Sequence, residues 1–117
     1  MKLRVRKNSL RLRLNSQDVA ALTQALLLED QVNFPGNSAL IYRLVPTADS
    51  RLDAAFSNGI ITVSIPLAKI RDWAPGEEIG LYFKIENLDI AIEKDLECTT
   101  ASTEESDPYA YPRKAAC

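Results

Sequence analysis

The sequence contains no histidine, the side chain that most often acts as a general base and as a ligand of catalytic metals. Nucleophile pairs that join serine or cysteine to histidine are excluded for the same reason. Glycine is also scarce, since the chain has four glycines and no cluster of them that would hold a phosphate. We therefore predict a protein that is not an enzyme, with no catalytic residues, no cofactor and no metal.

Long hydrophobic runs are missing as well. The longest aliphatic cluster covers residues 25–28, whereas a membrane-spanning helix needs roughly 20 apolar residues. The N-terminal residues alternate charged and apolar side chains, and they lack the continuous block of about 7 to 15 apolar residues found in secretory signals. We therefore predict a cytoplasmic protein that does not enter a membrane.

Cysteine occurs twice, at Cys98 and Cys117, both near the C-terminal end. Zinc sites usually bring cysteine or histidine in closely spaced pairs, and this spacing is different. In a cytoplasmic chain we expect two reduced thiols. The alternatives are a redox pair or half of a metal site.

The length of 117 residues, with 46% hydrophobic and 26% charged residues, is typical of one globular domain. Periodic segments fill residues 1–97, which we assign to a single β-rich domain. Residues 98–117 are polar, acidic and aperiodic, so we expect a flexible tail there. The net charge of −2 is unevenly spread: the first 17 residues carry six basic and no acidic side chains, whereas residues 93–107 carry six acidic side chains and one lysine.

Residues 2–14 alternate charged and apolar side chains, as a half-buried strand does. The apolar positions change from odd numbers, at Leu3 and Val5, to even numbers from Leu10 onward. One continuous strand cannot bury both sets, so we predict a bulge or tight turn near residues 8–9.

Two short helices are predicted. The first follows Asn15 or Ser16, which suit the N-cap of a helix. Its expected buried face consists of Val19, Leu22 and Leu26. The second begins at Pro66, because proline is favoured in the first turn of a helix. Its expected buried face consists of Leu67, Ile70 and Trp73. We also place the aromatic pair Tyr82-Phe83 in the core.

The other periodic segments predict strands at residues 29–34, 39–45, 52–56, 60–65, 79–85 and 88–93. Residues 10–45 and 60–92 follow the same order of strand, helix, acidic pair, strand, turn and strand. We predict an α+β, mainly β fold: a small barrel-like antiparallel sheet made from two β-α-β-β units with two short helices. The two units are either an internal repeat or only the similar order of elements that any α+β chain shows when it is divided in two.

Residues 61–92 contain a strand ending in Ile65-Pro66, a short helix, the turn Pro75-Gly76-Glu77-Glu78 and a hairpin. This order resembles the swapped-hairpin module of AbrB-type bacterial transition-state regulators and antitoxins. The resemblance implies a small β-rich barrel, and it raises the alternative of a DNA-binding transcriptional regulator or antitoxin. That family reads DNA with basic residues before and within the motif. Here residues 54–58 are uncharged and only Lys69 and Arg71 lie inside, so the DNA-binding residues do not carry over.

The whole chain is also similar to a small bacterial family of unknown function. The likeness rests on the opening residues 1–14, on Glu93-Lys94-Asp95-Leu96-Glu97-Cys98 and on the segment from Asp107 to Pro112. It implies no activity.

The candidate binding site is a basic stripe near the N-terminus. It consists of Lys2, Arg4, Arg6, Arg11 and Arg13. If the alternation holds, these side chains project from one face of a sheet, as a surface that binds a polyanion or a partner would require. The acidic overall charge and the absence of aromatic residues in the stripe make nucleic acid the less favoured ligand. The alternatives are a solvated face and neutralisation by the acidic segment that follows Glu93.

Three acids at alternate positions, Glu93, Asp95 and Glu97, have a spacing that could hold a hard cation. The alternative is a solvated strand edge that discourages unwanted pairing. An enzyme that uses carboxylates and a divalent cation therefore ranks last among the functions considered. The sequence favours a non-enzymatic protein-interaction module that binds an unknown protein partner, which includes the case of a homodimer.

Overall fold

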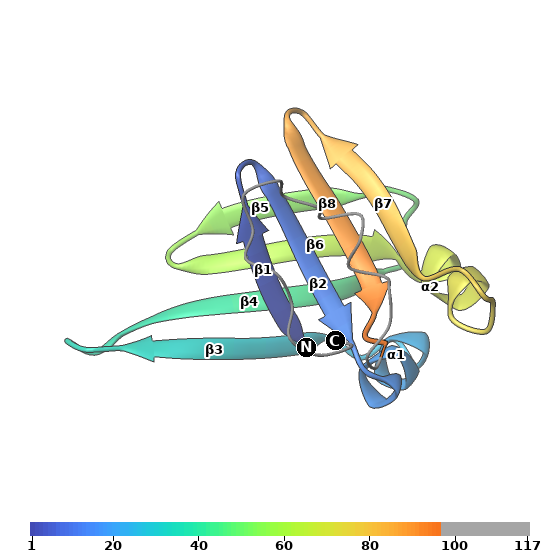
Figure 1. Ribbon diagram of the computed structural model, residues 1–117, viewed down its shortest axis with the longest axis horizontal. Helices are drawn as coiled ribbons and strands as arrows, with labels where there is room; N and C mark the ends of the chain where they lie inside the picture. The colour runs from blue at the N-terminus through green and yellow to red at the C-terminus, as the bar shows by residue number, and fades with distance from the viewer. Residues whose placement is uncertain (97–117) are drawn as a thin grey trace, which may run out of the picture.

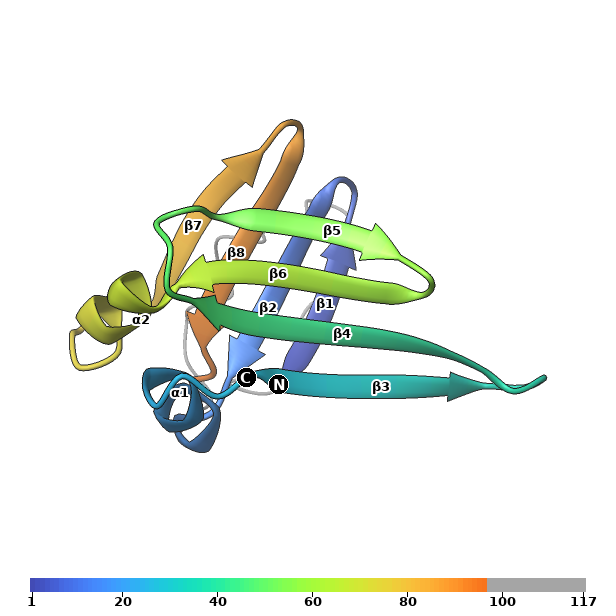
Figure 2. The ribbon, with the colours of Figure 1, turned by 180° about the vertical axis from the view of Figure 1, so that it is seen from behind.

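The computed structural model, drawn in Figures 1 and 2, describes residues 1–96. In chain order the elements are β1 (Lys2–Arg6), β2 (Ser9–Leu14), α1 (Ser16–Thr23), β3 (Leu28–Phe34), β4 (Ser38–Thr47), β5 (Asp53–Ser57), β6 (Ile60–Pro66), α2 (Leu67–Trp73), β7 (Gly80–Ile85) and β8 (Leu88–Lys94). The predicted tail at 98–117, with Cys98 and Cys117, lies outside the described residues, as does the last residue of the predicted 1–97 domain.

The parity change in the first 14 residues corresponds to a hairpin. β1 and β2 pair antiparallel from Lys2↔Arg13 to Arg6↔Ser9, which leaves residues 7–8 as a two-residue turn. Lys7 adopts a φ of +50° in this turn. Since Leu3 lies opposite Leu12, the odd and even apolar positions meet on one face of the hairpin. The predicted turn is confirmed, one residue before its expected place.

A capping box starts the first helix. The Asn15 side chain accepts a hydrogen bond from the backbone N–H of Asp18 at 2.8 Å, and the Asp18 carboxylate accepts one from the N–H of Asn15 at 3.1 Å. The helix ends at Thr23, and two residues later Ala25 takes a left-handed φ of +64°. The expectation that Leu26 lies on the buried face is therefore wrong, and its side chain is 54% exposed.

The second helix forms where it is predicted, but it begins at Leu67, and Pro66 is its N-cap. Ile70 and Trp73 are buried as expected, whereas Leu67 is only half-buried. The Trp73 indole N–H donates to the carbonyl oxygen of Glu78 at 3.1 Å, so the polar atom of this core residue is satisfied.

The strands form two separate four-stranded sheets. Sheet A has the order β1-β2-β8-β7, and sheet B has the order β3-β4-β6-β5. The central pairs, β2–β8 and β4–β6, are parallel, while the outer pairs are antiparallel hairpins. The α+β, mainly β class is confirmed. The prediction of one barrel-like antiparallel sheet is wrong. Within residues 1–96 there are two sheets, each has two unpaired strand edges, and the two central strands of each are parallel.

The chain exchanges hairpins between the sheets. Residues 2–47 and 53–94 each run hairpin, helix, hairpin, so the predicted β-α-β-β units each have a further strand in front. The first half supplies β1–β2 to sheet A and β3–β4 to sheet B, and the second half supplies β5–β6 to sheet B and β7–β8 to sheet A. A common origin of residues 10–45 and 60–92 stays a prediction.

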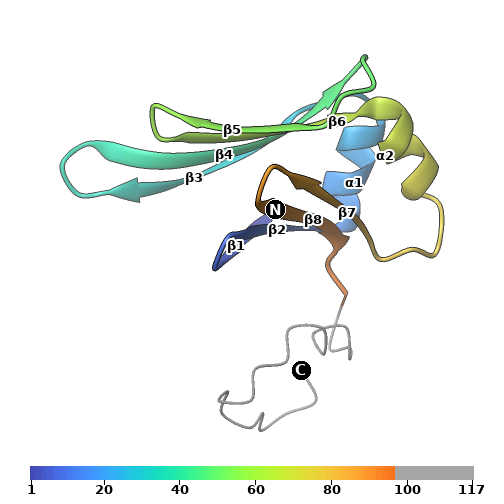
Figure 3. The same cartoon turned by 90° about the horizontal axis from the view of Figure 1, so that it is seen from above.

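The core lies between the two sheets. Their strands cross at a large angle, and the two helices close one end of the sandwich (Figures 1 and 3). The buried side chains are Leu12, Leu14, Leu22, Leu44, Val63, Ile65, Ile70, Trp73, Ile90 and Ile92. Burying each one fully contributes about 1.5–3 kcal/mol relative to exposure. Phe83 packs against this core, but Tyr82, one residue earlier on β7, is 56% exposed, so its placement in the core is wrong.

The end of the sandwich opposite the helices is open. The β3–β4 hairpin projects past the strands of sheet A in both views of the molecule (Figures 1 and 2). The inner face of sheet B is therefore uncovered near the tip of this hairpin.

Candidate binding surfaces

The outer face of sheet A carries the basic stripe. The hairpin register places Lys2 opposite Arg13 and Arg4 opposite Arg11, and Arg6 lies opposite Ser9. Residues that pair across two neighbouring strands project from the same face of a sheet. The five predicted residues therefore lie on one face, which we call the basic face.

A buried carboxylate lies on the same face. Glu93 of β8 is 2% exposed, and its carboxylate is 3.2 Å from Nη1 of Arg11 and 3.7 Å from Nε of Arg13. The hydroxyl of Tyr82 donates to the other carboxylate oxygen at 2.7 Å. Two guanidinium groups of β2 and one hydroxyl of β7 thus surround the acid. Such partners offset the free-energy cost of burying its charge.

A glycine makes this arrangement possible. Gly80 pairs with Glu93 across β7 and β8. A Cβ atom on Gly80 would lie 2.7 Å from the Tyr82 hydroxyl oxygen and 2.9 Å from Cγ of Glu93. A side chain at this position would therefore collide with the hydrogen bond between Tyr82 and Glu93.

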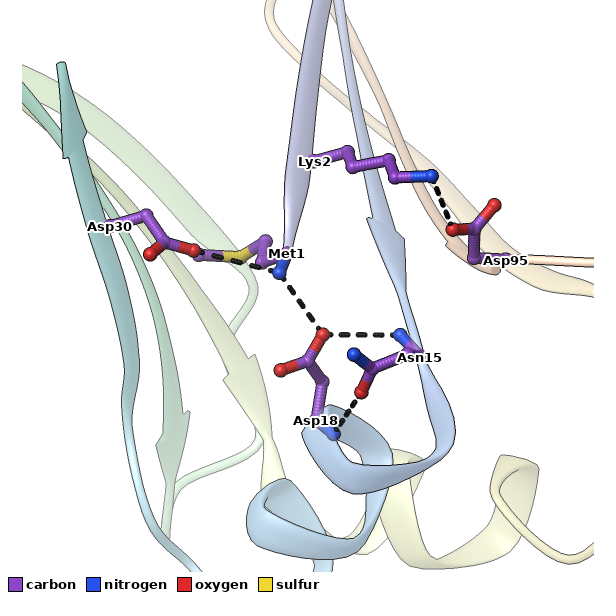
Figure 4. Close-up of polar contacts among 6 residues, drawn as sticks. All are labelled: Met1, Lys2, Asn15, Asp18, Asp30 and Asp95. Carbon is purple, nitrogen blue, oxygen red and sulfur yellow. Dashed lines mark hydrogen bonds and ion pairs between the residues drawn. The ribbon is translucent and has the colours of Figure 1, made fainter.

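Three acids hold the start of β1 (Figure 4). The Lys2 ammonium pairs with Asp95 at 2.7 Å, just beyond the end of β8. The N-terminal ammonium of Met1 lies 3.1 Å from the carboxylate of Asp18, the residue that completes the α1 capping box. A longer contact of 3.5 Å joins Met1 to Asp30. The first strand is thus tied to α1, to β3 and to the segment after β8.

Asp30 also affects Tyr42, its neighbour across β3 and β4. Burial raises the pKa of the Tyr42 hydroxyl above its ordinary value, and the negative charge of Asp30 raises it further.

The open end of the sandwich carries the second candidate surface. Four large apolar side chains on the facing sides of the two sheets are exposed there: Val5 at 62%, Val32 at 46%, Phe34 at 52% and Phe56 at 70%. We call these four residues the open-end patch. Beside it a cavity of about 330 Å³ separates Val5, Leu10 and Leu88 of sheet A from Leu40, Phe56 and Ile61 of sheet B. Sequence reasoning missed this surface, because a strand pattern identifies an inward face but not whether another sheet covers it.

The sequence matches a family of unknown function, DUF7009, over residues 1–114. The chain belongs to this family. The expected membership of an uncharacterised family is thereby confirmed, and the DUF7009 description names no activity. Comparison with curated proteins found no match, and comparison with solved structures found none.

The three acids considered for a cation have separate surroundings in this DUF7009 protein. Glu93 faces arginines and Asp95 pairs with Lys2, while Glu97 lies outside the described residues. Within residues 1–96, no three histidine, cysteine, aspartate or glutamate side chains gather closely enough to hold a metal ion. In that same part of the chain, no helix has the length and apolarity to cross a membrane.

Neutralisation of the stripe by acids after Glu93 is one of the predicted alternatives, and Asp95 does pair with Lys2. The pairing of Glu93 itself with the arginines was not predicted, nor were the roles of Tyr82 and Gly80. Tyr82 was assigned to the core because aromatic residues are usually buried. Gly80 carried a usable signal, since a glycine inside a strand often marks the close approach of another group. The group that approaches Gly80 is Glu93, and this follows only from the pairing of β7 with β8.

Proposed function

We propose that this protein is a non-enzymatic cytoplasmic module that binds a protein partner through the open end of its sandwich. The observation that carries the proposal is the exposure of Phe56 at 70% and Phe34 at 52%, both on the inner face of sheet B. Exposed apolar patches that adjoin a cavity are typical of protein interaction sites. Aromatic side chains supply much of the binding free energy at such sites.

Site-specific crosslinking in the native host tests this proposal. A photoreactive amino acid replaces Phe56 in one variant of the full chain and Asp53 in the other. The two positions lie on the same strand, both are exposed, and they face opposite sides of sheet B. We expect a discrete crosslinked species only from position 56. A species that contains two copies of this chain would identify the partner as a homodimer.

The substitution Phe34→Asp provides the second arm. Since the Phe34 side chain is half exposed, we expect the variant to fold and its thermal unfolding to stay close to that of the parent. The same substitution should abolish the crosslink at position 56, because it places a charge in the apolar patch. Equal crosslinking at positions 53 and 56, or no effect of Phe34→Asp, would contradict the proposal.

A DNA-binding regulator or antitoxin of the AbrB-like type is the second candidate. It is supported by the alignment of five cations on one face and by the exchange of hairpins between the halves of the chain. It ranks second because Glu93 and Asp95 already pair with three of those cations.

Binding to a mixed-sequence DNA duplex at several salt concentrations tests this candidate. If Arg4 and Arg6 contact phosphates, the double substitution Arg4→Gln and Arg6→Gln should make the negative slope of log affinity against log salt shallower by about 2. An unchanged slope, or affinity that does not vary with salt, would exclude the basic face as a DNA-binding surface.

A further inference from the structure

We infer that the protein partner contributes an extended segment, with apolar side chains at alternate positions, which adds to β5 as a fifth strand of sheet B. The inference rests on the proposed function, because it specifies how a partner binds at the open end. It is carried by the free edge of β5, by the part of sheet A that projects past this edge, and by the cavity between them.

The outer edge of β5 presents backbone groups without a strand partner. In the part of the chain that the structure describes, β5 pairs only with β6. The two strands are joined by a two-residue turn at 58–59, where both residues have a positive φ, so the closing pair Ser57↔Ile60 is hydrogen-bonded. Hydrogen-bonded pairs alternate along an antiparallel ladder. The N–H and C=O groups of Ala54 and Phe56 therefore point away from β6.

The hydrogen bonds between β6 and β4 give the same result. The N–H of Ile41 on β4 donates to the carbonyl oxygen of Gly59 at 2.9 Å. Backbone groups of successive strand residues point to opposite sides, so those of Ile61 also face β4. Ile61 lies opposite Phe56. Phe56 therefore exchanges no backbone hydrogen bonds with β6, and its N–H and C=O groups face the free edge.

Sheet A projects past this edge. The tip of the β7–β8 hairpin extends beyond β5 in both views of the molecule (Figures 1 and 2). The inner face of this hairpin carries Phe83, Ile85 and Leu88, which pack against the core but are only half-buried. A strand added beside β5 would lie opposite these side chains, at the usual spacing of about 10 Å between packed sheets. Sheet B thus leaves part of an apolar face uncovered at its β5 edge.

The cavity of about 330 Å³ lies against β5. Ala54, Ala55 and Phe56 line it, and Leu88 of the β7–β8 hairpin lines its other side. The side chains of an added strand would alternate between the two faces of sheet B, so every second one would point toward this space. Apolar side chains at those positions would also cover the ring of Phe56, which is 70% exposed.

The occupant is a single strand of a different protein rather than a second copy of this chain. Residues paired across neighbouring strands project from the same face, so two copies joined through β5 would carry their β7–β8 hairpins on the same side of the joined sheet. Because each hairpin projects past its own edge, the two tips would meet there. Edge strands that avoid pairing usually carry charges, whereas β5 has one only at Asp53, its first residue.

Selection from a phage-displayed library of random peptides, with the full chain as bait, tests the inference. Peptides of about 12 residues exceed the length of an average strand. Two variants differ in one backbone group: Ala54→Pro removes the outward N–H, and Ala54→Val keeps it while adding a side chain of similar size. Since proline is tolerated in an edge strand where the N–H faces solvent, the thermal unfolding of Ala54→Pro should stay close to that of the parent.

We expect the enriched peptides to alternate apolar and polar residues. Synthetic copies should bind Ala54→Pro roughly tenfold more weakly than the parent, because a hydrogen bond is lost and the acceptor on the peptide stays unsatisfied. Binding to Ala54→Val should change by less than about threefold. In the parent, a bound peptide should slow amide hydrogen exchange at Ala54 and Phe56 and leave Ala55, whose N–H already bonds to β6, unchanged.

Three results would overturn the inference: no enriched peptide, enriched peptides without alternation, or equal binding to Ala54→Pro and the parent. Slowed exchange at Ala55 but not at its two neighbours would also overturn it. A crosslink from position 56 in the native host would in each case leave the proposed function standing, because crosslinking does not depend on the backbone conformation of the partner. Loss of that crosslink as well would contradict both.

Discussion

Removal of the charge on Glu93 should cost a large share of the protein's stability. The substitution Glu93→Gln preserves the shape of the side chain, and its amide oxygen still accepts the hydrogen bond from Tyr82 at 2.7 Å. It removes the negative charge that lies 3.2 Å from Arg11 and 3.7 Å from Arg13. The two arginines then repel each other across the position that the carboxylate occupied.

The magnitude follows from burial. Breaking a fully buried ion pair costs about 3–5 kcal/mol. The Arg11 and Arg13 side chains keep 19% and 27% of their surface exposed, so water screens part of their charge. We therefore expect Glu93→Gln to lower the free energy of unfolding by about 2–3 kcal/mol. In urea this shifts the unfolding midpoint by about 1–2 M without a change in the slope.

Asp89→Asn is the matched control. Asp89 lies on the same strand and the same face, and its pair with Lys84 at 3.6 Å leaves both side chains more than half exposed. Its replacement should cost less than about 0.5 kcal/mol. If the two substitutions have equal effects on the urea midpoint, the carboxylate of Glu93 does not hold the basic face together and the reasoning is refuted.

Two further substitutions test other parts of the fold. Asn15→Ala removes the α1 cap and should lower the free energy of unfolding by about 1 kcal/mol, a loss of roughly 4–8 °C in Tm for a small domain, whereas Ser16→Ala should change little. Burial and the charge of Asp30 raise the pKa of the Tyr42 hydroxyl in the folded protein above its ordinary value of 10.0. The protonated hydroxyl therefore stabilises the folded state fully below that value, and this stabilisation is lost as the pH rises through the pKa of the folded state. Urea unfolding between about pH 9 and 11 should therefore show a smaller loss of stability for Tyr42→Phe than for the parent, and equal losses would assign alkaline sensitivity to other groups.

Most elements could be predicted because their signals are local. The alternation around Leu12 and Leu14 identifies the inward face of β2, and Asn15 and Pro66 mark where helices begin. The placement of five cations on one face follows from the same alternation. The pairing of hairpins could not be predicted, because a period of two shows which way a side chain points but not which strand lies beside it.

Both candidate surfaces depend on how the strands and sheets are arranged. Glu93 meets Arg11 and Arg13 only because β8 pairs in parallel with β2. Phe56 remains exposed at the open end, where a cavity separates it from Val5 and Leu10 of sheet A. Both results depend on strand partners and strand lengths, which no local pattern of residues contains.

The exchange of hairpins leaves neither half of the chain with a whole sheet. Residues 48–52 form the covalent link between two pieces that complete each other. A cut in this link would yield fragments that reassemble into the same sandwich without a peptide bond between them. Two intact chains could also exchange halves, so that each sandwich contains one half from each chain. Every contact between the halves would then form twice, and the dimer would need no new interface.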